Sequence, residues 1–156
     1  MGSAFSWILL GALAVLLIVA CWCDIRSRII PNALNLAIAL LAIPFWWSLG
    51  LPLWPDAALQ LGVAILVFGL FAIAFALGAM GGGDVKLVAA IALWLPAQAV
   101  FALLFIMSVA GGALTLAMFI RHRLARRTER LEIPYGVAIA FGGLWLISER
   151  FLNHFG

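Results

Sequence analysis

Residues 87–120 read LVAAIALWLPAQAVFALLFIMSVAGGALTLAMFI and contain no charged side chain. One continuous helix of this length would extend about 51 Å at about 1.5 Å per residue. That is too long for a single crossing of a hydrocarbon core of about 30 Å, and it is short for two crossings. Pro96 offers a break, because proline disfavours helix at the residue before it. We therefore expect a short span over 85–95 and a longer one over 97–120.

The composition of the whole chain agrees with a membrane protein. Its 156 residues are 67% hydrophobic and 10% charged, with a mean hydropathy of +1.24. Soluble domains are about 45–50% apolar and about 25% charged. Further apolar runs predict spans over 4–23, 33–51, 58–79 and 135–152. We expect an all-α integral membrane protein, a bundle of six transmembrane helices in which residues 1–156 form a single polytopic domain without a soluble domain.

The basic residues predict the orientation of this bundle. The net charge of +3 does not indicate nucleic-acid binding, because the basic residues lie between the apolar runs. Six spans place eight of the nine Lys and Arg on one side and leave Arg150 on the other. The positive-inside rule puts those eight in the cytoplasm and both termini outside. The polar segment 121–132 is expected to bind lipid headgroups. An aromatic belt is expected at the outer interface, formed by Trp7, Trp46, Trp47, Trp54 and Trp94.

Two aspartates stand out in this apolar sequence, Asp24 in CDIRSRIIPN (23–32) and Asp84 in GGGDVK (81–86). A carboxylate near hydrocarbon costs a few kcal/mol or more, so it usually has a function. The simpler interpretations are an interfacial residue for Asp24 and a helix N-cap for Asp84. Three glycines before Asp84 are costly unless the backbone must approach a neighbour closely. Because the span over 85–95 is short, we expect the glycine loop to dip into the membrane.

Both aspartates fall at the cytoplasmic end of the expected bundle, which suggests an acid/base pair. Two nearby carboxyls share one proton because both cannot ionise cheaply. The ionised carboxylate can then activate water while the protonated carboxyl polarises a peptide carbonyl. Asp84 opens a helix, whose dipole favours negative charge, and Asp24 lies near the end of one. We therefore assign Asp84 as the base and Asp24 as the acid, in a pair that titrates as a unit.

These motifs resemble the type IV prepilin peptidase family of GxGD intramembrane aspartic proteases. The family pattern has an aspartate several residues before Ile-Pro-Asn, matched by Asp24 and Ile30-Pro31-Asn32. Its Gly-x-Gly-Asp followed by Val-Lys is matched by residues 81–86, and a late Pro-Tyr-Gly by Pro134-Tyr135-Gly136. The resemblance implies catalysis by Asp24 and Asp84. It also implies a site shaped by Gly81, Gly82, Gly83, Lys86, Ile30, Pro31, Asn32, Pro134, Tyr135 and Gly136.

The resemblance further implies cleavage of the basic leader from prepilins, membrane proteins with an apolar helix, at the cytoplasmic face of the bacterial inner membrane. Long members carry paired CxxC motifs and methylate the new N-terminus. This chain has no CxxC pair and resembles the short members that serve tight-adherence (Flp) pili, or archaeal preflagellin peptidases. We therefore expect no N-methyltransferase activity. The reaction requires no cofactor, and no metal is expected because His122 and His154 lack partner ligands.

Two smaller expectations concern polar residues beside the aspartates. Asn32 is expected to cap the second helix. Lys86 could tune the charge of Asp84 or anchor the helix at the interface.

Two other functions remain open from the sequence. The first is a small proton- or cation-coupled transporter that uses the same aspartates. A transporter should carry polar residues through the depth of the bilayer, whereas here they cluster at one end. The second is a non-catalytic scaffold for pilus assembly. The oligomeric state is not determined by the sequence.

Overall fold

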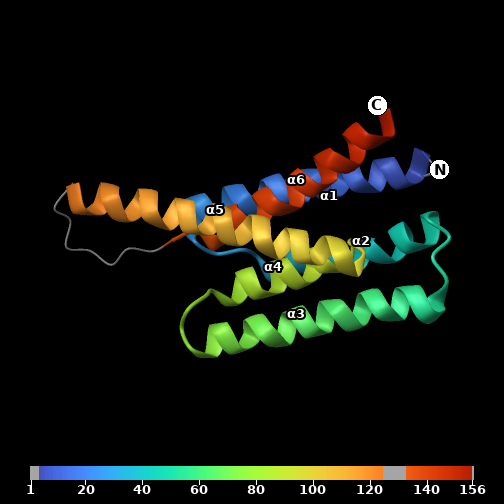
Figure 1. Cartoon of the computed structure of the whole chain (residues 1–156), viewed down its shortest axis with the longest axis horizontal. Helices are drawn as coiled ribbons and strands as arrows, with labels where there is room; N and C mark the ends of the chain where they lie inside the picture. The colour runs from blue at the N-terminus through green and yellow to red at the C-terminus, as the bar shows by residue number, and fades with distance from the viewer. Residues whose placement is uncertain (1–3, 125–132, 156) are drawn as a thin grey trace.

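The computed structural model describes residues 4–124 and 133–155, and these residues form helices and no strand (Figure 1). The prediction of an all-α protein is confirmed for them. A π-helical turn, η1 (Leu53–Ala57), leads into the third helix. The α-helices are α1 (Ala4–Ser27), α2 (Asn32–Ser48), α3 (Ala58–Ala76), α4 (Gly82–Ala92), α5 (Ala97–Leu124) and α6 (Tyr135–Phe155).

Three helical segments are both long and apolar enough to cross a membrane: Ala4–Ser27, Leu53–Ala76 and Ala97–Leu124. Helix α2 is apolar but shorter. The expected break near Pro96 is confirmed, because α4 ends at Ala92 and α5 begins at Ala97. Helix α5 continues to Leu124 and projects beyond its neighbours (Figure 1). Residues 125–132 of the expected headgroup-binding segment lie outside the described residues.

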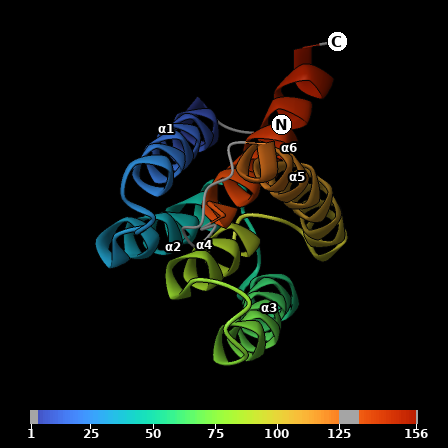
Figure 2. The same cartoon turned by 90° about the vertical axis from the view of Figure 1, so that its left-hand side faces the viewer.

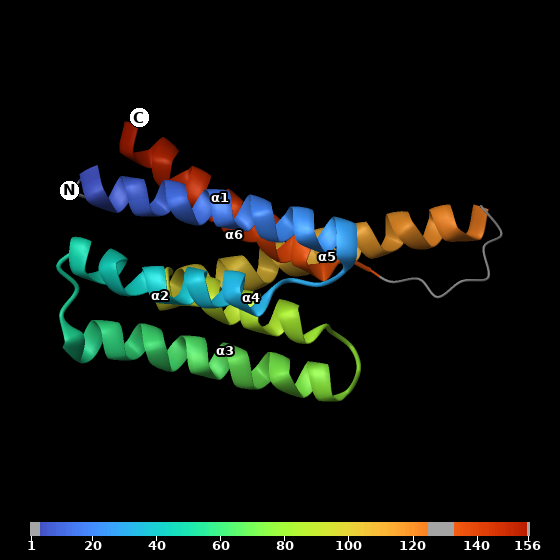
Figure 3. The same ribbon diagram turned by 180° about the vertical axis from the view of Figure 1, so that it is seen from behind.

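The helices form two groups of three, which Figures 2 and 3 show from the end and from behind. Helix α6 packs mainly against α1 and α5, whereas α4 packs mainly against α2 and α3. The groups meet along a seam where α1 contacts α2 and α6 contacts α4. Leu17, Leu87 and Ile139 are fully buried in the resulting core. The seam therefore brings α1, α4 and α6 together.

Two tryptophans join the far end of α4 to α2. The Trp94 Nε1–H donates a hydrogen bond to the Ile38 carbonyl (2.9 Å). The Trp46 Nε1–H donates one to the Leu93 carbonyl (2.7 Å). Trp94, which we expected in an interfacial belt, is instead buried, because α4 is short and its end is enclosed by the bundle. Trp47 and Trp54 are exposed, as residues of such a belt would be.

Candidate active site

Asp24 and Asp84 meet at one end of the bundle although 60 residues separate them in the chain. Both side chains are buried, with exposed fractions of 4% and 8%. They line the same open pocket, of about 440 Å³. The two carboxyls interact electrostatically. The pocket therefore holds two carboxyl groups that can influence each other's ionisation.

Asp24 projects from the last two turns of α1 and is held by the start of α6. Its Oδ2 accepts a hydrogen bond from the Val137 N–H (3.2 Å), and the Gly136 N–H also bonds to the carboxyl. These N–H groups belong to the first turn of α6, where helices leave donors unpaired. The Arg28 side chain adds a favourable charge interaction. Two helices distant in sequence thus fix the position of this carboxyl.

Asp84 is the third residue of α4, and Gly81 is the N-cap. The interpretation of Asp84 as the N-cap is therefore wrong. The Asp84 N–H donates to the Gly81 carbonyl (3.1 Å), and the Gly81 N–H bonds to the Asp84 carboxylate. A side chain that reaches back from the third position to the N-cap N–H forms one half of a capping box. Asp84 is thereby oriented by its own helix start.

Two glycines allow the close approach of the backbone to the site. A Cβ at Gly136 would lie 2.8 Å from Asp24 Oδ2 and 2.7 Å from Ile30 Cδ1. A Cβ at Gly83 would lie 3.2 Å from the Ile30 Cβ. All three distances are shorter than ordinary van der Waals contacts, so larger residues would displace the site's walls. Glycine before Asp84 is therefore explained as expected, because the Gly83 backbone approaches Ile30 closely.

The structure brings most of the predicted site residues together. Tyr135 is an exception, because its ring packs toward Gly111 on α5 and does not line the pocket. Pro134 is buried just before α6. The predicted residues that line the pocket are Asp24, Ile30, Pro31, Asn32, Gly81, Gly82, Gly83, Asp84 and Lys86.

The prediction that Asn32 caps α2 is wrong. The N-cap is Pro31, and no side chain caps this end. The Asn32 Oδ1 instead accepts a hydrogen bond from Lys86 Nζ (2.8 Å), which joins the starts of α2 and α4. A local capping rule could not anticipate this pairing, because the two residues are 54 positions apart.

Sequence reasoning missed Asn35, which lies one turn further along α2. Its Nδ2 donates to the Gly83 carbonyl (3.1 Å), so it holds the peptide that precedes Asp84. The side chain is 5% exposed, and its Oδ1 has no hydrogen-bond partner. An amide inside an apolar span was the available signal, since polar groups at such depth are costly. Arg28, Ile29 and Phe75 also line the pocket and were not predicted to do so.

The sequence profile of the type IV leader peptidase family matches residues 11–116, about two thirds of the chain. This protein belongs to the type IV leader peptidase family. The matched segment contains both Asp24 and Asp84. Neither a curated protein nor a solved structure matches the chain.

For a leader peptidase, this pocket has the chemical groups that peptide hydrolysis requires. It is open, it contains two interacting carboxyls, and backbone N–H groups orient both of them. Within residues 4–124 and 133–155, no group of three or more His, Cys, Asp or Glu side chains converges as metal ligands would. Two buried carboxyl groups in one open pocket can exchange protons with a bound molecule, as general acid/base chemistry requires.

Proposed function

We propose that this leader peptidase is an aspartic endopeptidase that removes the basic leader from prepilins. The observation that carries the proposal is the burial of Asp24 and Asp84 in one pocket, where their carboxyls interact. Such a pair shares one proton, as in other two-aspartate proteases. We place the reaction at the cytoplasmic face of the bacterial inner membrane, with both termini outside, following the distribution of basic residues.

In the proposed reaction, the ionised carboxylate removes a proton from a water molecule, which attacks the scissile carbonyl carbon. The protonated carboxyl donates to the carbonyl oxygen, so that a neutral tetrahedral diol forms. The carboxyl that took the proton then passes it to the amide nitrogen. The C–N bond breaks, and the carboxyl that first donated recovers its proton. The products are the free leader and a mature pilin with a new amino terminus.

The roles of the two aspartates are less distinct than the sequence indicated. From the sequence, Asp84 is assigned as the base because it lies at the start of its helix, whereas Asp24 lies near the end of its helix. In the structure, Asp24 also lies at a helix N-terminus, that of α6, and accepts hydrogen bonds from it. Helix dipoles therefore favour negative charge on both carboxyls and do not separate acid from base. We propose a shared proton, without an assignment in the free enzyme.

The position of the buried polar groups supports a one-sided reaction site over a transport pathway. Of the four buried polar residues in the described part of the chain, Asp24, Asn35 and Asp84 lie at or near the pocket, and Ser6 lies in the first turn of α1. The middle of the bundle is formed by apolar residues such as Leu13, Ile38 and Ile91. A proton or cation pathway needs polar groups across the membrane. As the resemblance implies, we further propose that the enzyme serves tight-adherence (Flp) pili and has no N-methyltransferase activity.

The test is cleavage of a synthetic prepilin by the full chain in detergent. We expect Asp24→Asn and Asp84→Asn each to lower turnover by at least about a hundredfold, because each removes a proton-transfer group. Asp56→Asn is the matched control, since Asp56 lies in η1 at the opposite end of the bundle. Circular dichroism should show unchanged helix content in all three variants. Wild-type rates in both site variants would disprove the proposal.

A further inference from the structure

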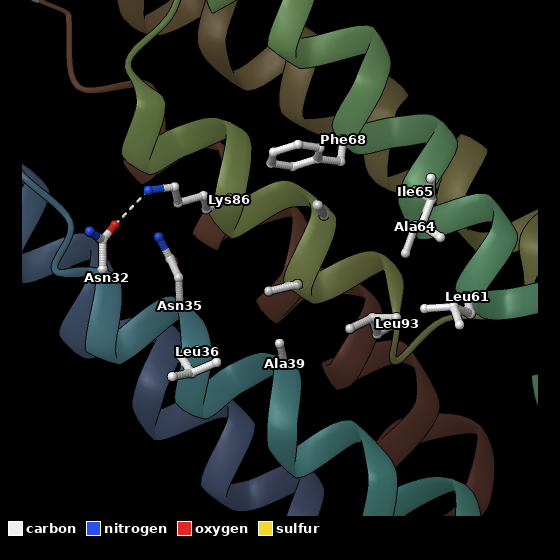
Figure 4. A pocket seen from close by; sticks show the side chains of 12 residues that line it. Asn32, Asn35, Leu36, Ala39, Leu61, Ala64, Ile65, Phe68, Lys86 and Leu93 are labelled. Atoms are coloured by element: carbon white, nitrogen blue, oxygen red, sulfur yellow. Dashed lines mark hydrogen bonds between the residues drawn. The ribbon is translucent and has the colours of Figure 1, made fainter.

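A second, largely apolar pocket of about 490 Å³ lies between α2, α3 and α4 (Figure 4). Helices α2 and α3 both pack on α4 but hardly contact each other. The pocket is therefore an open groove, which we name the α2–α3–α4 groove, with α4 as its floor. Exposed apolar side chains such as Leu36 and Ile65 form its walls.

The lining residues have the spacing of a helix-binding site. On each of the three helices, four residues at positions i, i+3, i+4 and i+7 face the groove, beginning at Asn32, Leu61 and Lys86. This spacing marks one face of a helix and is typical of contacts with a neighbouring helix. Ala39, Ala64, Ala89 and Ala90 lie among them. Small residues let a helix backbone approach closely inside a membrane.

The groove adjoins the candidate active site. Asn32 and Lys86 line both the groove and the aspartate pocket. The unpaired Oδ1 belongs to Asn35, which also lines the groove next to these two residues (Figure 4). The Oδ1 atom itself is buried, so the pairing of the polar groups at this end of the groove is incomplete.

We propose that the α2–α3–α4 groove binds the apolar helix of the substrate. This inference rests on the proposed function, in which the substrate is a leader followed by such a helix. The first turn of a helix has N–H groups without partners, and the active-site end of the groove is its polar end, lined by Asn32, Asn35 and Lys86. The helix then extends along α4 away from the aspartates. The preceding peptide enters the pocket that contains Asp24 and Asp84.

Site-specific photo-crosslinking tests this placement. A benzophenone amino acid replaces Ile65, which lines the groove, or Leu66, the next residue on α3, which lines no pocket described above. Both side chains are exposed, with fractions of 62% and 71%, so the two positions are matched. We expect the full chain to crosslink to added prepilin or its mature product at least about tenfold more from position 65. Equal yields, no adduct with prepilin, or adducts only with lipid or a second copy of the chain would overturn the inference.

A kinetic measurement tests the same groove independently. Ala39→Phe places a ring in the groove, whereas Leu40→Phe adds the same ring at the neighbouring exposed position. We expect Ala39→Phe to raise KM for prepilin at least about tenfold with little change in kcat, because groove binding is equal in ground and transition states. Leu40→Phe should leave both constants near wild type. An unchanged KM in Ala39→Phe would refute the groove as the binding site. If the wild type does not cleave prepilin, the proposed function itself fails.

Discussion

At the scale of single residues, Gly136 is a position on α6 where a side chain would crowd the Asp24 carboxyl. Gly136→Ala would put a methyl group against Asp24 Oδ2 and Ile30 Cδ1. We expect activity to fall about a hundredfold, the usual effect of moving a catalytic group by about 1 Å. The measurement is prepilin cleavage at saturating substrate.

The matched control is Gly112→Ala on α5, where a Cβ would meet no atom within 4 Å. Alanine is favoured over glycine within a helix by about 0.5–1 kcal/mol. Both substitutions therefore raise helix propensity, and neither should destabilise its helix for that reason. A fully active Gly136→Ala enzyme would show that the position of Asp24 is not restricted by α6.

A second prediction at this scale concerns Asn35. Asn35→Leu keeps the size of the side chain but removes the donor to the Gly83 carbonyl. We expect a loss of about 0.5–1.5 kcal/mol in stability, the usual net contribution of one hydrogen bond, together with lower kcat. Thermal unfolding in detergent measures the first effect and prepilin cleavage the second.

The same substitution at Asn32 is the comparison, because Asn32 is exposed and its hydrogen bond to Lys86 lies at the surface. It should cost less stability than Asn35→Leu. A larger effect at Asn32 would contradict the role assigned to Asn35.

At this scale, the sequence indicated the two acidic residues of the pocket better than the contacts that support them. Asp24 and Asp84 could be singled out because carboxyls are rare and costly in apolar segments. Asn35 and Arg28 could not be assigned in the same way, because their roles depend on partners that only the packed bundle supplies. The prediction for Asn32 failed for the same reason: a capping rule considers one helix, whereas its partner Lys86 belongs to another.

At the scale of helices, the joint between α2 and α4 should be important for stability. Trp94→Phe removes the donor to the Ile38 carbonyl and part of a buried ring that stacks 4.8 Å from Phe45. We expect a loss of about 1–3 kcal/mol from the missing hydrogen bond and the smaller side chain. Trp47→Phe, at a residue that is 80% exposed, should have almost no effect on thermal unfolding. Equal losses of stability in the two variants would show that the buried contact of Trp94 with α2 makes no specific contribution to stability.

The described helices lie within a few residues of the expected spans, and three helical segments are long and apolar enough to cross a membrane. The apolar runs without charges and the break at Pro96 are enough to locate the helices, because backbone N–H and C=O groups in lipid must form hydrogen bonds within helices. The ends of α1 and α5 were predicted too early, since both helices continue past their first basic residues, to Ser27 and Leu124. A polar residue ends a hydropathy run but does not end a helix.

At the scale of the whole molecule, the orientation in the membrane is the prediction to test. Leu77→Cys lies at the aspartate end of the bundle and Leu53→Cys at the opposite end, and both positions are exposed. In cells that express a chain with Cys21 and Cys23 replaced by serine, an impermeant maleimide should label position 53 directly. Position 77 should react only after the inner membrane is permeabilised. The reverse pattern would invert the proposed topology.

The pairing of helices could not be predicted from the sequence. Most of them are apolar on every face, so hydrophobic periodicity does not show which side meets a neighbour. The order of the expected spans predicted only that the two aspartates lie at the same end of the bundle. The contacts of α4 with both α2 and α6, on which the site depends, are properties of the packed bundle.

The seam between the two groups of helices has one further consequence. Asp24 belongs to the group of α1, α5 and α6, and Asp84 to the group of α2, α3 and α4. In the proposed reaction, hydrolysis therefore needs the two groups of helices packed against each other. Solvents that loosen this junction should abolish cleavage at concentrations where the circular dichroism signal is still intact, and dilution should restore it. Activity would then report whether the two groups of helices are packed together, because separation of the groups would inactivate the enzyme.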